Sequence, residues 1–133
     1  ICDSMNYLLS TEEIFAMFRC IKEALAEDGV AILDMKTAYC FQKVMGNQTR
    51  VDETEEALMI WDNTYDEVTC INEYLLTIFT EDKATGMYAR YDECHEQRAY
   101  TEDEIKSCLK ETSLRLVKSW TEDEVRTYFV IQR

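Results

Sequence analysis

The chain contains 133 residues, of which 27 are acidic and 14 are Lys or Arg, so its formal net charge is −13 at pH 7. This length suits one domain, and hydrophobic residues at 47% are enough to build a core, which argues against disorder. A chain this acidic, without a cluster of Lys and Arg, is a poor match for a nucleic acid backbone or an anionic membrane surface. We therefore expect a cytoplasmic protein with no nucleic acid partner and no membrane partner.

Glycine and proline are scarce, which removes one class of binding site. Only three glycines are present, Gly29, Gly46 and Gly86, and there is no proline. A phosphate-binding loop needs two or three glycines within a few residues, because the backbone must approach the ligand closely. The sequence contains no loop of this kind. It also begins at Ile1 rather than at a methionine, and on these two grounds we expect a fragment of a longer protein.

Six cysteines are spread along the chain, at positions 2, 20, 40, 70, 94 and 108. None of them forms a CxxC or CxxH pair, so a structural zinc site is not supported. The acidic runs at 52–56 and 121–124 lack the alternating ligands and the glycine of a calcium loop. We predict reduced thiols and no metal site.

The first half of the chain has an α/β pattern. Apolar residues recur at helical spacing over 11–28, with Ser10 or Thr11 as the N-cap and Gly29 as the C-cap. The continuous apolar run 30–33 predicts a strand buried on both faces, as in a parallel sheet. Residues 1 and 2 would then be the end of the preceding strand, and a short helix is expected over 39–45.

The second half begins with an antiparallel pattern. Three stretches rich in β-branched and aromatic residues, separated by charged turns, lie between 57 and 100 and predict a three-stranded meander. Thr101 followed by Glu104 predicts a capping box at the start of a helix. Two closing strands are expected over 114–120 and 126–131.

Several side chains that could take part in catalysis or substrate binding lie in the predicted meander. His95 is the only histidine, and histidine is the side chain best suited to act as a base near neutral pH. Strand alternation places Tyr91, Glu93 and Gln97 on the same face as His95. Arg98 can clamp an anionic group or form an ordinary ion pair. Trp61 and Tyr91 can line a substrate site, or they can simply pack the meander onto its neighbours.

The order of these elements resembles the C-terminal half of a class I S-adenosylmethionine-dependent methyltransferase, of the small bacterial type with a β lid. Residues 25–35, LAEDGVAILDM, are similar to the segment that leads into the fifth strand of that family, with Glu-Asp-Gly where Pro-Gly-Gly is usual. Residues 95–104, HEQRAYTEDE, are similar to the family stretch H-x-Q-R-x-Y-[ST]-x-x-E. The resemblance implies an α/β fold: a partial Rossmann-like segment over 1–56, an inserted three-stranded antiparallel lid over 57–100, and a closing helix and two strands over 101–133.

The resemblance also implies a function and a set of site residues. Cys2, Asp3 and Ser4 would contact the cofactor S-adenosylmethionine, and Asn6 and Tyr7 would lie near the acceptor, although Asp3 and Ser4 can also be plain turn formers. Further substrate contacts are expected at the carboxyl ends of the strands and in the lid, from Tyr39, Trp61, Tyr91 and Arg98, with His95 as the catalytic base.

The glycine-rich cofactor loop of the family is absent from this sequence, so we weigh two functions, with an acidic protein-interaction domain unrelated to methyl transfer as a third. The first is methyl transfer to a small-molecule acceptor by a domain that a missing N-terminal half completes. The second is a non-catalytic module that dimerises or forms another homo-oligomer through its exposed sheet edges.

Overall fold

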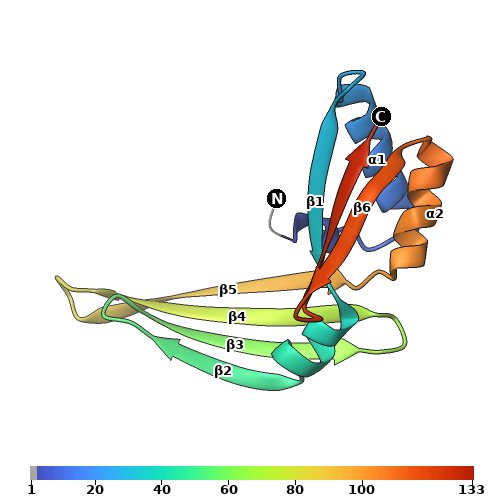
Figure 1. Cartoon of the computed structure of the whole chain (residues 1–133). Coiled ribbons are helices and arrows are strands. Elements are labelled where there is room, and N and C mark those ends of the chain that lie inside the picture. The colour runs from blue at the N-terminus through green and yellow to red at the C-terminus, as the bar shows by residue number, and fades with distance from the viewer. Residues whose placement is uncertain (1–2) are drawn as a thin grey trace.

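The structure, a computed structural model, describes residues 3–133 and consists of two connected units (Figure 1). The predicted strand end at residues 1 and 2 lies outside the described residues. The first unit contains the 3-10 helix η1 (Ser4–Tyr7), α1 (Thr11–Ala24), β1 (Val30–Lys36), α2 (Glu102–Thr112), β6 (Arg115–Glu122) and β7 (Arg126–Gln132). The second is a meander of β2 (Gln48–Glu53), β3 (Ala57–Asp66), β4 (Ile71–Asp82) and β5 (Met87–Arg98), which we call the lid. A short π-helix, η2 (Cys40–Met45), joins the first unit to β2.

Both long helices begin at capping boxes. The side chain of Ser10 accepts a hydrogen bond from the backbone amide of Glu13, and the side chain of Thr101 accepts one from the amide of Glu104. In both boxes the glutamate side chain accepts a hydrogen bond from the backbone amide of the capping residue. However, α1 ends at Ala24 rather than at residue 28, because Leu25 is already extended. The predicted C-cap at Gly29 is therefore wrong. A glycine is needed there because a Cβ atom would lie 2.9 Å from the backbone nitrogen of Ala26.

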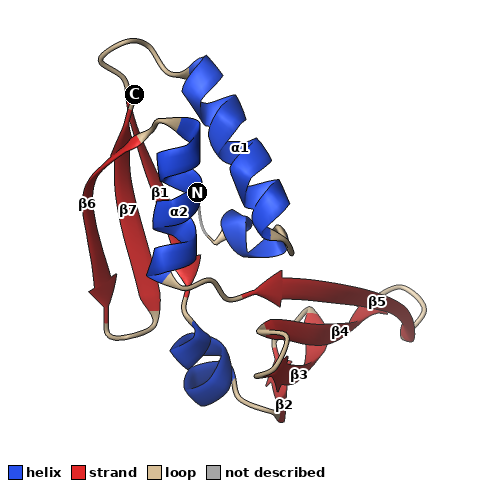
Figure 2. Cartoon of the chain, turned by 90° about the vertical axis from the view of Figure 1, so that its right-hand side faces the viewer, coloured by secondary structure: helices blue, strands red, loops and turns tan. Residues whose placement is uncertain are grey.

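The first sheet has the order β1-β7-β6, and both of its strand pairs are antiparallel. Helices α1 and α2 lie side by side on one face of this sheet (Figure 2). The main core fills the space between them and includes Ile14, Phe18, Leu33, Met35, Ile105, Leu109, Phe129 and Ile131.

The prediction that 30–33 is buried on both faces is wrong for this chain. Val30 is 53% exposed and Ile32 is 61% exposed, whereas Leu33 is 5% exposed. The reason is that both helices cover the same face of the sheet, so alternate residues of β1 point away from the core. In addition, β1 is an edge strand, paired only with β7 among the described residues.

The lid has four strands in the order β2-β3-β4-β5, so the three predicted strands are present and a fourth precedes them. All six residues of β2 are exposed. Such a strand has no apolar alternation, which is why the sequence pattern does not reveal it. The lid therefore begins at Gln48 rather than at residue 57.

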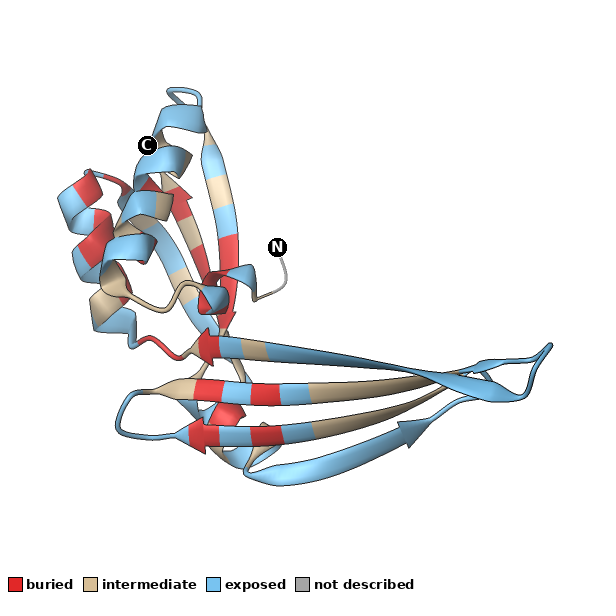
Figure 3. Ribbon diagram, turned by 180° about the vertical axis from the view of Figure 1, so that it is seen from behind, coloured by how far each residue is buried: buried red, intermediate tan, exposed pale blue. Residues whose placement is uncertain are grey.

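Only the end of the lid nearest the helices is buried (Figure 3). The buried side chains there are Asn63, Tyr65, Asn72, Tyr74 and Gln97, which we call the lid base. Beyond the base, β4 and β5 continue to a turn near Gly86 with no buried residue. The lid is thus anchored at one end and open to solvent at the other.

Three further observations concern residues 3–133 alone. No helix in this range is long and apolar enough to cross a membrane. The five cysteines in it are free thiols. No group of three or more His, Cys, Asp or Glu side chains in it is placed to hold a metal ion.

Candidate active site

A cluster of paired charges lies where β1 ends against the lid base. The Asp3 carboxylate lies 2.8 Å from the Lys36 ammonium and 3.2 Å from the Arg126 guanidinium, which also pairs with Asp34. Burial would raise the pKa of Asp3, but the bonds from Lys36 and Arg126 outweigh it and lower that pKa. The two carboxylates and the two cations of this cluster give it a net charge of zero.

Asn6 fixes η1 to both units of the protein. Its side chain is fully buried, donates to the carbonyl oxygens of Lys36 at 3.1 Å and Arg98 at 2.9 Å, and accepts from the Lys36 amide at 2.8 Å. The side-chain amide of Asn6, which was predicted to contact an acceptor, is therefore already bonded to the backbone of β1 and β5. Asn6 acts here as a structural bridge that positions Tyr7.

A chain of hydrogen bonds runs from Tyr74 to Glu93 along the lid base. The hydroxyls of Tyr7 and Tyr74 lie 2.5 Å apart, Tyr7 lies 3.2 Å from Nδ1 of His95, and Nε2 of His95 lies 3.1 Å from Glu93. If Nε2–H donates to Glu93, then Nδ1 is the ring nitrogen that accepts from Tyr7. Burial, together with the bond to Tyr7, raises the pKa of Tyr74, so Tyr74 remains a donor.

Three aromatic rings stack across the lid strands beside this chain. The ring centroids of Trp61 and Tyr74 are 4.5 Å apart, and those of Tyr74 and His95 are 4.7 Å apart, with nearly parallel planes in both pairs. Tyr74 and His95 are direct partners in the β4–β5 register. The stack therefore connects the only histidine to Trp61.

Trp61 forms part of the wall of a cavity of about 320 Å³ between the lid, η2 and the end of β1. Its walls combine apolar side chains with two cations and one acid. They are Lys36, Cys40, Met45, Gln48, Arg50, Asp52, Met59, Trp61 and Asn63. A cavity of this size with a few polar groups is typical of a small-molecule site.

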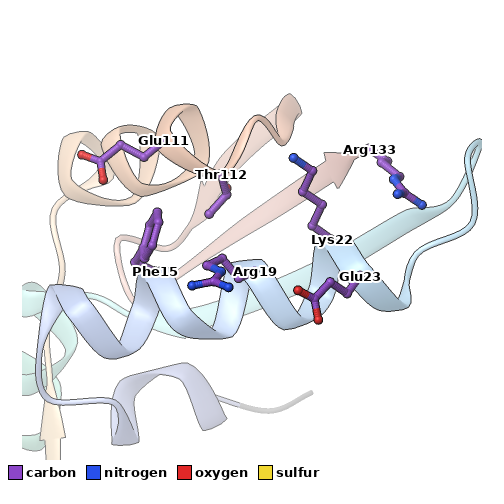
Figure 4. A pocket seen from close by; sticks show the side chains of 7 residues that line it. All are labelled: Phe15, Arg19, Lys22, Glu23, Glu111, Thr112 and Arg133. Atoms are coloured by element: carbon purple, nitrogen blue, oxygen red, sulfur yellow. The ribbon is translucent and has the colours of Figure 1, made fainter.

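A second cavity, of about 460 Å³, lies between α1 and α2 (Figure 4). Phe15, Arg19 and Lys22 reach it from α1, and Arg133 reaches it from the end of β7. Because Gln132 pairs with Val30, this cavity lies near the amino end of β1. Ligands of open α/β sheets bind at the carboxyl ends of the strands, so the cavity beside Trp61 is the better candidate.

The structure brings several of the predicted site residues together and separates others. Asp3, Asn6, Tyr7, Trp61 and His95 surround the lid base, as the contacts above show. Tyr39 caps η2 and is 42% exposed, and Tyr91 is 56% exposed on the part of β5 beyond the base. Cys2 lies outside the described residues. Ser4 begins η1 beside Asp3.

Arg98 points away from the site. Its guanidinium pairs with Glu104 at 3.0 Å, donates to the Leu9 carbonyl at 3.3 Å and lies over the Tyr100 ring. These contacts correspond to the ion-pair alternative rather than to a clamp on an acceptor. The Arg98 side chain connects the end of β5 to the start of α2.

Sequence reasoning missed Arg126 and Arg50 as site residues, and it considered Tyr74 only as one of the lid aromatics that could surround a substrate. The position of Tyr74 opposite His95 could have been found by pairing β4 with β5 through the turn at 83–86. Arg126 carries no local signal, since its partners lie more than 90 residues away in the chain. Arg50 lies on the strand whose pattern was not recognised.

Comparison with known proteins shows which class of protein this chain is similar to in sequence and fold. No family model matches the sequence. A curated protein of Geobacillus sp. (strain WCH70), provisionally named a methyltransferase, is 31% identical over 140 residues, covering 99% of this chain and 56% of that protein. The crystal structure of an S-adenosylmethionine-dependent methyltransferase from Clostridium acetobutylicum superposes with a TM-score of 0.86 at 26% identity, covering 98% of this chain and 55% of that one.

The predicted resemblance to class I S-adenosylmethionine-dependent methyltransferases is therefore confirmed in sequence and in fold, as a partial Rossmann-like domain with a lid. The cofactor prediction agrees with these relatives. The fold is shared with CalS10 from Micromonospora echinaspora, whose structure was solved with S-adenosylmethionine bound; the two superpose with a TM-score of 0.62 at 14% identity, covering 94% of this chain and 53% of that one. The chain spans about half the length of the relatives it matches.

Proposed function

We propose that this chain carries the acceptor-binding part of a methyltransferase that acts on a small molecule. The observation that carries the proposal is the hydrogen-bond chain Tyr74–Tyr7–His95–Glu93, which begins next to the wall of the cavity beside Trp61. S-adenosylmethionine, when bound, supplies an electrophilic methyl group on a sulfonium. The residues of this chain hold the acceptor and accept its proton.

The turn at Asp3 and Ser4 is the part of this chain that we propose faces the cofactor. Asp3 has a left-handed backbone, and its amide donates to Asp34 at the end of β1. Because the carboxylate of Asp3 is already paired with Lys36 and Arg126, the contact is made by the backbone of the turn. The zero charge of the cluster is compatible with a cofactor that carries charges of both signs.

The hydrogen-bond chain supplies a path for one proton. As the acceptor's nucleophilic atom gains the methyl group, it loses its proton to the oxygen of Tyr7, which is the exposed tyrosine of this hydrogen-bond chain. Tyr7 passes its own hydroxyl proton to Nδ1 of His95, while the buried Tyr74 donates a hydrogen bond to the Tyr7 oxygen. The resulting imidazolium lies beside the Glu93 carboxylate, which stabilises the positive charge.

The test is methyl transfer by the complete protein, with the expected N-terminal half present, from S-adenosylmethionine to a panel of small-molecule acceptors, with the methylated product detected by mass spectrometry. His95→Gln should lower the rate by roughly 100-fold, the loss expected when general base catalysis is removed. Cofactor binding measured by calorimetry should not change. Glu96→Gln is the matched control, since Glu96 is exposed on the opposite face of β5. Unchanged turnover in the His95 variant would remove the base role, and no product with any acceptor would contradict the proposal.

The open edge of β1 favours a second candidate function, a non-catalytic module that self-associates. An edge strand with exposed Val30 and Ile32 presents both unpaired backbone groups and apolar side chains. Either a second copy of this chain or the expected N-terminal half can cover this surface. Sedimentation equilibrium of the wild-type chain and of Ile32→Lys tests self-association. A dimer that the substitution dissociates supports it, and a wild-type monomer at high concentration contradicts it.

A further inference from the structure

We infer that the cavity beside Trp61 takes an acceptor with a planar ring and an anionic group, a carboxylate or a phosphate, and that Arg50 binds the anion. The inference deepens the proposed function, on which it rests only in calling the ligand the acceptor. Three observations carry it: the unpaired state of Arg50, its register with Trp61, and the composition of the cavity walls.

Among residues 3–133, Arg50 has no carboxylate partner, although the chain is rich in carboxylates. Its only hydrogen bond among the described residues is a 2.6 Å contact from Nη2 to the Val44 carbonyl, and no acid of these residues lies within 4.0 Å of its guanidinium. This bond uses one nitrogen of the guanidinium and leaves its other N–H donors without a partner among the described residues. A guanidinium in this state is prepared to bind a carboxylate or a phosphate through two bonds.

The β2–β3 register places Arg50 directly opposite Trp61. Directly opposed side chains of an antiparallel pair lie on the same face of the sheet, with Cβ atoms about 5 Å apart. The cation and the indole therefore border the same cavity, one offering an anion contact and the other a flat apolar surface. Met45 and Met59 supply the apolar surface around the ring.

The other charges of the cavity leave Arg50 as the anion contact. Lys36 also lines the cavity, but its ammonium is paired with Asp3 and donates to Gln97. Asp52 lies opposite Met59, two pairs further along β2 and on the same face as Arg50, and repels an anion at that end. The anionic group is thus directed to the end of the cavity bounded by Arg50 and Trp61.

The experiment is an NMR titration of the full 133-residue chain with three single-ring probes, benzoate, phenyl phosphate and benzamide. The chain has two tryptophans, so two indole N–H signals report separately on Trp61 and Trp120. Trp120 stacks on Tyr128 in the first sheet and serves as the internal reference. Trp120→Phe assigns the two signals.

We expect an anionic probe to shift the Trp61 signal without moving that of Trp120, and the neutral benzamide to bind at least about tenfold more weakly, the loss expected for one charge-assisted hydrogen bond. The tighter of the two anions identifies the group as carboxylate or phosphate. Arg50→Gln should reduce the affinity for the anion to that for benzamide, whereas Arg50→Lys should retain part of it. Lys43→Ala is the matched control, because Lys43 is an exposed cation of η2 that does not line the cavity.

Equal binding of benzoate, phenyl phosphate and benzamide would overturn the inference, and so would an unmoved Trp61 signal with all three probes. A Trp120 signal that is unchanged in Arg50→Gln shows that the variant is folded. Because no cofactor is present in the titration, a failure of methyl transfer leaves this result unaffected. The two proposals therefore fail independently.

Discussion

Replacing Asn6 by leucine should destabilise the protein strongly, because the buried amide connects three segments. The substitution keeps the approximate size of the side chain but removes all three hydrogen bonds. The amide and the carbonyl of Lys36 and the carbonyl of Arg98 lose their partner beside a fully buried side chain. Each such loss costs about 1–3 kcal/mol, and taking the lower part of that range gives a loss of about 3–5 kcal/mol in the free energy of unfolding.

Urea denaturation followed by far-UV circular dichroism measures this loss. Asn47→Leu is the control, because Asn47 is exposed and accepts one bond, from the Tyr65 amide at 2.7 Å; it should cost about 1 kcal/mol. A loss below 1 kcal/mol for Asn6→Leu would refute the structural role. If such a stable variant showed instead a raised KM for the acceptor, the original prediction that Asn6 contacts the acceptor would be supported.

Three other predictions follow from contacts around the site. The pKa of Asp3 is lowered below its ordinary value of 3.8, so the stability it contributes is complete above that pH and is lost as the pH falls through the lower folded value. Asp3→Asn should therefore be less stable than wild type at pH 7, with a difference that shrinks in acid-unfolding curves below pH 3.8; a constant difference would contradict this. Asn63 and Asn72 exchange two buried 2.9 Å hydrogen bonds, so a double-mutant cycle with leucine should show coupling of about 1–2 kcal/mol, and additive losses would count against it. Arg98→Lys should lower the free energy of unfolding, measured by heat or urea, by about 1 kcal/mol, because a lysine cannot reach both Leu9 and Glu104. Arg90→Lys, at an exposed ion pair, is the control and should cost almost nothing. Equal losses in the two variants would show that the two-armed guanidinium of Arg98 is not needed.

The sequence was sufficient for features that depend on neighbouring residues. The capping boxes at Ser10 and Thr101 follow from residues three positions apart, and strand alternation correctly placed Glu93 beside His95. The same local reasoning failed at Val30 and Ile32. Whether those two side chains are buried depends on which face of the sheet the helices cover, and the apolar run itself does not specify this.

The candidate site depends on contacts that no local pattern encodes. Tyr7 meets Tyr74 across 67 positions of the chain, and Arg126 meets Asp3 across 123. The hydroxyls and charges involved are ordinary in composition, so their pairing emerges only when η1, β1 and the lid base are brought together. His95 stood out as the only histidine and Tyr7 through the resemblance to a known family, but neither observation supplied the geometry that joins them.

The anchoring of the lid at one end gives the protein a mechanical property. Strands β4 and β5 have 12 residues each, which corresponds to a length of about 40 Å, and their buried residues all lie at the base. At that length, a rotation of about 5° at the base displaces the tip by roughly 3–4 Å. A fluorophore attached at Ala84, in the exposed turn at the tip, would therefore report small rotations of the lid base as larger displacements than a label beside Tyr74 would show.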